Sequence, residues 1–159
     1  MGFLKIIGAL LLALSGALGA YVTNQRAAHS LRQAEGWLML LRLIRTQVEC
    51  FSLPISRILS GCDPSLLIRC GYGYREPPDG LESLWRCCEI RDGETDGLIS
   101  DFVREFGKGY REEQLRSCDY YVGLLSARRD ALASQLPARK RVSSTLWISG
   151  ALATVILLI

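Results

Sequence analysis

Side chains that could do chemistry are few and widely spaced in this chain. Its 159 residues include a single histidine, His29, and six cysteines. A serine or cysteine nucleophile needs a neighbouring base, most often a histidine that a carboxylate holds in place. Because no aspartate or glutamate is spaced to orient His29, we do not expect a histidine-based catalytic triad.

Two other patterns that could bind a ligand are incomplete. The stretch GYGYRE (71–76) resembles the start of a glycine-rich phosphate loop, but it lacks the third glycine, a preceding strand and a Gly-Lys-Ser/Thr sequence. Asp92, Glu94 and Asp96 lack the full spacing of a calcium-binding loop. We therefore expect no catalytic residues, no metal site and no cofactor, and we do not expect an enzyme.

The six cysteines allow two interpretations. In a secreted domain they would form three disulfides. However, Cys87 and Cys88 are adjacent, and no Cys-x-x-Cys pair occurs. Cys50, Cys118 and one of the adjacent pair fall on the apolar side of helical patterns, where a free cysteine behaves as a small hydrophobic residue. This pattern favours buried, reduced thiols in a cytosolic domain.

Apolar residues are concentrated at both ends of the chain. Residues 6–22 read IIGALLLALSGALGAYV, and residues 142–159 read VSSTLWISGALATVILLI. A helix that crosses a bilayer core needs about 20 mostly apolar residues. We predict transmembrane helices over 3–22 and 142–159, with one domain, 24–137, between them.

Cations flank the two apolar segments on their inner sides. They are Arg26 and Arg32 after the first segment, and Arg139, Lys140 and Arg141, here called the membrane collar, before the second. Cytoplasmic flanks of spanning helices carry an excess of Lys and Arg. The predicted topology is a hairpin with the domain in the cytoplasm and both termini outside.

The first apolar segment has an alternative interpretation. Lys5, the apolar run and the small residues Ala17, Gly19 and Ala20 also fit a secretory signal peptide with a cleavage site. In that case the domain would lie outside the cytoplasm, carry disulfides and be held by a C-terminal anchor.

The region between the apolar segments is predicted to be all-α. Helical periodicity covers 26–50, 52–60, 64–70, 81–90, 98–106 and 112–135, with loops at 71–80 and 91–97. A wide apolar stripe in the first of these helices indicates that it faces more than one neighbour. Ser52 is expected to cap the second helix, with Pro54 in its first turn and Gly61 at its end. Asp63 and Pro64 are expected to open the next helix in the same way. Pro137 is expected to mark the junction between the last helix of this helical bundle and the second transmembrane helix.

Several short pieces follow one another in a distinctive order. They are LKIIGALLL at the start, the Leu-rich helix through Val48 to Pro54 and Ile55, Trp85, the pair Phe106 and Gly107, and SQLPARKRVSSTLWISGALATVILLI at the end. In this order the chain resembles, over nearly its whole length, the stage III sporulation protein AB family of endospore-forming bacteria. The last piece, with Lys140 followed by Ser149 and Gly150, is the most specific.

The resemblance implies a cytoplasmic helical domain similar to that of the platform protein of type II secretion systems. Family members act in the mother-cell membrane that faces the forespore, within a secretion-like complex, and their neighbour is an ATPase resembling secretion motor proteins. We therefore expect a membrane scaffold that docks this ATPase and other membrane components, without a small-molecule substrate. The balance of 19 basic and 16 acidic residues argues against a nucleic-acid partner. A helical membrane adaptor unrelated to sporulation is a third interpretation.

Departures from the family pattern fall on charged positions. Arg45 and Gln47 replace two acidic residues that the family tends to have before a Pro-Leu step, and Glu49 is displaced. Further along, Arg111 stands where the family usually has a Leu-Gly step. Gln114 lies near the position at which the family then has an aspartate. Changes of charge affect the choice of partner more than the fold. These five residues form the candidate partner interface.

Overall fold

A computed structural model describes the backbone of residues 2–51, 53–74 and 76–158, and the side chains of 25–51, 53–74 and 76–135. Two compact units are present: unit 1 combines Met1–Ala28 with Ala133–Ile159, and unit 2 is His29–Leu132.

The predicted transmembrane helices, 3–22 and 142–159, lie outside the residues whose side chains are described, and so does the membrane collar of Arg139, Lys140 and Arg141. Within the part of the chain that is described, no helix combines the length and the apolar character needed to cross a membrane. The two spans and the collar stay predictions.

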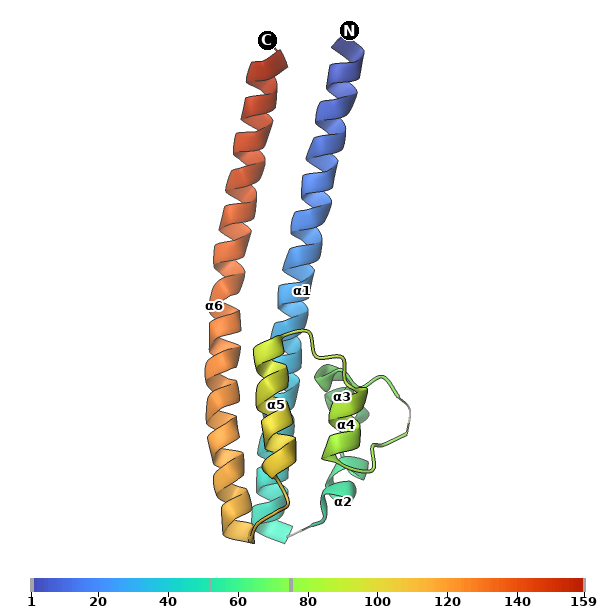
Figure 1. Ribbon diagram of the computed structural model, residues 1–159, viewed down its shortest axis with the longest axis vertical. Helices are drawn as coiled ribbons and strands as arrows, with labels where there is room; N and C mark the ends of the chain where they lie inside the picture. The colour runs from blue at the N-terminus through green and yellow to red at the C-terminus, as the bar shows by residue number, and fades with distance from the viewer. Residues whose placement is uncertain (1, 52, 75, 159) are drawn as a thin grey trace. The chain divides into compact units, whose positions relative to one another are not determined.

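The all-α class is confirmed. The helices are α1 (Gly2–Phe51), α2 (Ile55–Ser60), α3 (Pro64–Cys70), α4 (Leu81–Cys87), α5 (Gly93–Glu105) and α6 (Arg111–Leu158) (Figure 1). The described backbone contains no strand, only an isolated antiparallel bridge between Tyr72 and Cys88.

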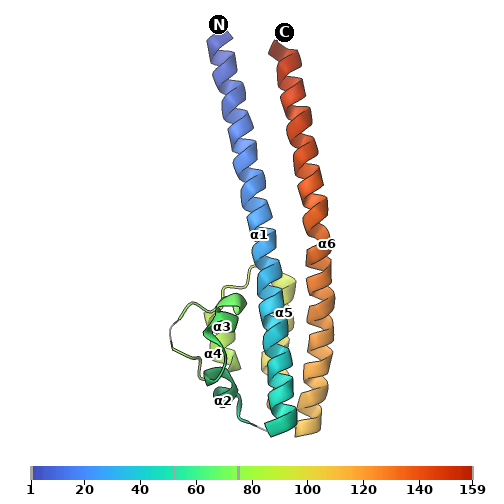
Figure 2. The same cartoon turned by 180° about the vertical axis from the view of Figure 1, so that it is seen from behind.

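Within unit 2, α1 is the central element. Opposite views show α6 on one side of it and the short helices α2, α3 and α4 on the other, with α5 in front of α1 in Figure 1 and behind it in Figure 2. Its buried residues are Gln33, Ala34, Gly36, Trp37, Leu38, Leu40, Leu41, Ile44 and Val48. This set is wider than one helical stripe, which confirms that the helix faces more than one neighbour.

Two contacts hold α1 against the end of α3. The indole Nε1 of Trp37 donates a hydrogen bond to the carbonyl oxygen of Cys70 over 3.0 Å. One residue earlier, Gly36 lies so close to α3 that a Cβ built on it would be 2.8 Å from the backbone carbon of Arg69. Glycine usually weakens a helix interior, so its presence here reflects this close approach.

A buried amide attaches the connection between α4 and α5 to α1. The Gln33 side chain, 2% exposed, donates from Nε2 to the carbonyl oxygen of Glu89 over 2.8 Å. Its Oε1 accepts from the backbone N–H of Arg91 over 3.4 Å. Because a buried amide needs such partners, this connection has a fixed course over α1.

Aromatic side chains pack α5 against α6. The ring of Phe102, which is fully buried, lies edge-on to Tyr121 with 5.5 Å between centroids, and 5.1 Å from Phe106. The Tyr121 hydroxyl donates to the carboxylate of Glu105 over 2.9 Å. The tyrosine thus adds a polar contact to an apolar one.

Predictions about the short helices are partly confirmed. Asp63 caps α3, since its Oδ1 accepts from the Ser65 N–H over 2.9 Å, and Pro64 is the first residue of this helix. Gly61 ends α2 as expected. Ser52 lies outside the described residues. Pro54 was expected in the first turn of α2, but it is the N-cap, because its extended backbone (ψ 145°) precedes the helix.

Two boundaries were predicted wrongly: the helix expected over 81–90 already ends at Cys87, and the loop expected over 91–97 is partly helical. The segment 91–97 is not a loop, because α5 already begins at Gly93, and Thr95 is buried. Asp92 caps this helix by accepting from the N–H of Thr95 over 3.0 Å, and carboxylates in a first turn interact favourably with the helix dipole. Pro137, predicted at the junction with the second transmembrane helix, lies within α6, which continues to Leu158. A proline removes one N–H donor, and the hydrogen bonds of the neighbouring turns remain available.

Asp92 also joins α5 to α6. Arg128 donates to both of its carboxylate oxygens, with Nη2–Oδ1 at 2.7 Å and Nε–Oδ2 at 2.9 Å. The two side chains are only 18% and 15% exposed. The hydrogen bonds from Arg128 outweigh the desolvation of the carboxylate, and with those from Thr95 they lower the pKa of Asp92 from its ordinary value to about 2.

A carboxylate whose pKa is lowered by folding stabilises the folded state above its unfolded pKa. This contribution is lost as the pH falls through the folded pKa. For Asp92 the loss should occur between about pH 4 and pH 2. We expect Asp92→Asn to lower the free energy of unfolding by about 1–2 kcal/mol at pH 7, and by less than half of that at about pH 2.5. Urea unfolding at both pH values measures this. Asp101→Asn, at the exposed ion pair with Arg104, controls for the loss of a carboxylate; an equal pH dependence in both variants would contradict the expectation.

Candidate functional site

Arg45 is the centre of an ionic cluster between α1 and α6. Its Nη1 lies 2.6 Å from Oε2 of Glu49, one turn further along α1. Its Nε and Nη2 donate to the two carboxylate oxygens of Asp119 in α6, the second over 3.4 Å. The hydrogen bond and charge of Asp119, followed by the charge of Glu49, raise the pKa of Arg45. All three side chains are at least one-third exposed, so the ion pairs contribute little to the free energy of unfolding. The cluster mainly determines the pattern of charge on this surface.

Arg111 closes the end of α1. Its Nε donates to the carbonyl oxygen of Val48 over 3.1 Å, and its Nη2 donates to the carbonyl oxygen of Glu49. The last carbonyls of a helix have no partners within the helix, and a cation near them is favoured by the helix dipole. Arg111 therefore connects the first turn of α6 to the last turn of α1.

The five residues of the candidate interface are not equally connected. Arg45, Glu49 and Arg111 join α1 to α6 through the contacts above. Gln114 donates from Nε2 to the carbonyl oxygen of Gly109 over 2.9 Å and lines a groove. Gln47 is half-buried on α1, and no hydrogen bond of its side chain is seen among the described residues.

Asp119 belongs to the cluster, although the sequence analysis missed it. It lies 74 residues from Arg45, so only the packing register of α6 on α1 could have identified it. No local pattern distinguishes Asp119 from the other acidic residues of α6.

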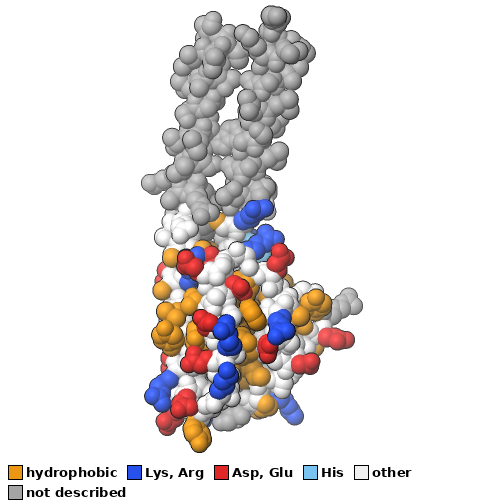
Figure 3. All heavy atoms as spheres, viewed as in Figure 1, with side chains coloured by type: hydrophobic (Ala, Val, Ile, Leu, Met, Phe, Trp, Pro, Cys, Tyr) orange, Lys and Arg blue, Asp and Glu red, His pale blue; other side chains and the backbone are white. Residues whose placement is uncertain are grey.

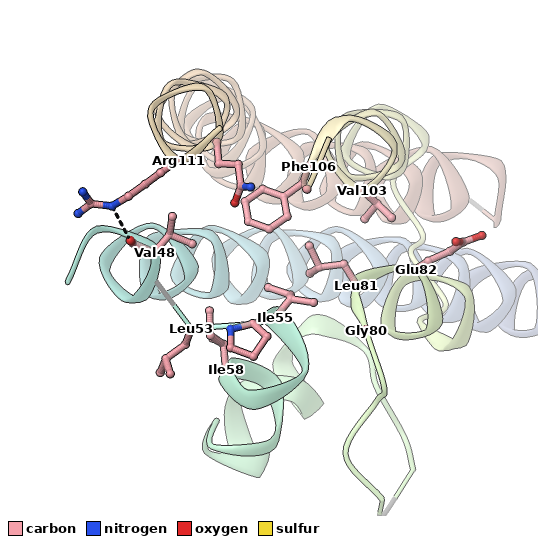
Figure 4. Close-up of a pocket in the computed structure, with 13 residues that line it drawn as sticks. Val48, Leu53, Ile55, Ile58, Gly80, Leu81, Glu82, Val103, Phe106 and Arg111 are labelled. Carbon is pink, nitrogen blue, oxygen red and sulfur yellow. Dashed lines mark hydrogen bonds between the residues drawn. The ribbon is translucent and has the colours of Figure 1, made fainter. Parts of the chain in front are cut away.

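An apolar groove of about 530 Å³ opens beside this cluster. Its walls come from the end of α1, the start of α2, the start of α4, the end of α5 and the first turn of α6 (Figure 4). The residues that line it are Val48, Leu53, Pro54, Ile55, Ile58, Gly80, Leu81, Glu82, Val103, Phe106, Gly107, Arg111 and Gln114. Two members of the candidate interface, Arg111 and Gln114, therefore belong to its rim.

Large apolar side chains are also exposed at this end of unit 2. Phe51, the last residue of α1, is 67% exposed, and Leu53 is 39% exposed. Tyr110, which directly precedes Arg111, is 86% exposed. The face shown in Figure 3 has charges of both signs interspersed with apolar side chains. Exposed aromatic and apolar residues beside a charged rim are typical of protein-binding surfaces.

The cysteines are free thiols with different environments. Cys62, Cys70 and Cys118 are buried and Cys88 is half-buried, whereas Cys50 and Cys87 are exposed. The prediction for Cys118 is confirmed. That for the adjacent pair is confirmed only in part, because Cys88 packs against the core but is half-buried and lies just past the end of α4. The prediction for Cys50 is wrong, because this side chain is exposed in the last turn of α1. Burial raises the pKa of Cys118 to about 11 and that of Cys88 to about 12. These two thiols stay protonated at neutral pH and are poor nucleophiles.

Within residues 25–51, 53–74 and 76–135, no three side chains among His, Cys, Asp and Glu are grouped so as to hold a metal ion. A comparison of the chain with protein-family models, with curated proteins and with solved structures found no match.

Proposed function

We propose that this protein is a membrane-anchored scaffold of a secretion-like complex in the mother-cell membrane that faces the forespore, and that it docks a cytosolic ATPase. The observation that carries the proposal is the joining of Arg45, Glu49 and Arg111 beside the apolar groove of unit 2. Three positions at which the charge differs from the family pattern or is displaced thus lie beside an apolar surface of the kind that binds proteins.

The proposed mechanism needs no chemistry of its own. The predicted spans 3–22 and 142–159 belong to α1 and α6, and both helices also supply the core of unit 2. A partner docked where α1 ends and α6 begins would therefore act on the two helices that carry the anchors. The scaffold would fix the position of the motor, and the energy would come from the motor itself.

Charge reversal in the ionic cluster tests the docking. The double variant Glu49→Lys, Asp119→Lys would surround Arg45 with cations while leaving the apolar core unchanged. Because like charges at an interface cost several kcal/mol, we expect at least about a tenfold loss of ATPase recovered with the tagged full chain from sporulating cells. Mass spectrometry quantifies this recovery, and unfolding measurements should show a change within about 1 kcal/mol, since the cluster is exposed.

Glu35→Lys is the matched control, because Glu35 is an exposed carboxylate of α1 outside the cluster. Equal recovery of the ATPase with the double variant and with this control would contradict the proposed surface. Failure of the unchanged chain to recover any ATPase would contradict the proposed function. The same would follow if a membrane-impermeant maleimide labelled the exposed Cys50 and Cys87 in intact cells, since unit 2 would then lie outside the cytoplasm.

A further inference from the structure

The apolar groove has opposite charges at its two ends. In Figure 4, Arg111 and Glu82 lie at opposite ends of the labelled side chains, with Leu53, Phe106 and Leu81 between them. A purely apolar ligand, such as a lipid chain, would leave both charges unused. The groove is therefore suited to a ligand that is apolar in its middle and charged at both ends.

Both charges are available to a ligand. Glu82 is 66% exposed and pairs only with Arg86, one turn along α4, at 2.6 Å. An exposed pair of this kind exchanges with another cation at little cost. Arg111 uses Nε and Nη2 on the carbonyls of α1, and its Nη1 has no partner within the described residues. One end of the groove thus offers a donor and the other an acceptor.

The walls also restrict the form of the ligand. An extended peptide gains affinity from backbone hydrogen bonds to a sheet edge, and the described backbone has no strand to supply one. A helix satisfies its own backbone groups and presents apolar side chains at positions i, i+4 and i+7 to an apolar groove. The absence of a sheet edge in these walls and the apolar floor together favour a helix.

We propose that the groove binds an amphipathic helical segment of the docked partner, with a carboxylate at the end that meets Arg111 and a cation at the end that meets Glu82. This inference rests on the proposed function, in which the partner is the cytosolic ATPase. It adds the chemistry by which the partner is recognised: an apolar face with charges of opposite sign at its ends.

Three designed peptides of about 15 residues test this recognition by fluorescence anisotropy with the purified full chain. Each has leucine at i, i+4 and i+7. The first has Glu at one end and Lys at the other, the second has Glu at both ends, and the third has Lys at both ends. Because each exposed charge pair contributes about two- to fivefold in affinity, we expect the first peptide to bind most tightly.

Variants of the chain distinguish charge recognition from non-specific binding of apolar peptides. Glu82→Lys should move the preference to the peptide with Glu at both ends, which a merely structural role of Glu82 would not do. Asp101→Lys is the matched control: Asp101 is also an exposed carboxylate that pairs with an arginine on its own helix, and it does not line the groove. This control should leave the ranking unchanged. Leu53→Asp should weaken all three peptides at least about tenfold.

An unchanged ranking in Glu82→Lys, or equal binding of the three peptides, would overturn the inference. Self-association of the full chain that Leu53→Asp abolishes would also overturn it, because a second copy would then cover the groove. If the ATPase is recovered but the three peptides bind equally, the result contradicts this inference and leaves the proposed function supported. If the ranking of the peptides switches as expected while no ATPase is recovered, the result supports recognition of a helix with opposite charges at its ends. It contradicts the proposed function.

Discussion

Replacing Gly36 with alanine should lower the free energy of unfolding by about 2–3 kcal/mol. The added Cβ would lie 2.8 Å from the backbone carbon of Arg69 and 2.9 Å from the backbone nitrogen of Cys70. Backbone atoms cannot give way as the tip of a flexible side chain can, so α3 would have to move from α1. That movement would also stretch the hydrogen bond from Trp37 to the carbonyl of Cys70.

Gly123→Ala is the matched control for this experiment. Gly123 also lies inside a long helix, but a Cβ on it would have nothing within 4 Å. Alanine is the better helix former, so this variant should be unchanged or more stable by about 0.5–1 kcal/mol. Urea unfolding followed by circular dichroism measures both. Destabilisation of the two variants by the same amount would show that α1 and α3 do not approach closely at Gly36.

Phe102→Ala should have the largest effect, a loss of about 3–5 kcal/mol in the free energy of unfolding. The Phe102 ring is fully buried and contacts Phe106 and Tyr121, so its removal leaves a cavity between α5 and α6. The surrounding helices can close such a cavity only in part. Thermal and urea unfolding of the full chain measure the loss.

Tyr120→Ala provides the comparison for this variant. Tyr120 is an aromatic residue of α6 whose ring centroid lies 5.2 Å from that of Tyr121, but its side chain is 62% exposed. Its removal opens no enclosed space, so we expect a loss of less than about 1 kcal/mol. A similar loss in both variants would mean that Phe102 is not part of the core.

Local signals in the sequence were sufficient for most of the helices. The Asp63-Pro64 start of α3 and the wide apolar stripe of α1 were predicted from residue types and period alone. The start of α5 was missed because Gly93 and three nearby carboxylates resemble a polar loop. The spacing of Asp92 and Thr95, a cap residue three positions before its partner, was the available signal.

Contacts between distant residues could not be predicted in this way. Gln33 bonds to Glu89 across 56 residues, and Arg45 bonds to Asp119 across 74 residues. Such pairs depend on how the helices are rotated against one another, which the period of one helix does not determine. The groove depends on five separate elements and was therefore not predicted, although two of its rim residues, Arg111 and Gln114, were singled out.

Arg111 takes part in two interactions, one within the fold and one proposed with a ligand, so a substitution at this position would affect both. It closes the end of α1 through two carbonyls, and it stands at the rim of the groove. A lysine has one ammonium group in place of the planar fork, so it could not serve the carbonyls and a ligand in the same way. A change of partner that requires a different charge at this rim would therefore also require a new way to end α1. In the proposed docking, the binding preference of the groove and the stability of α1 would therefore be inherited together.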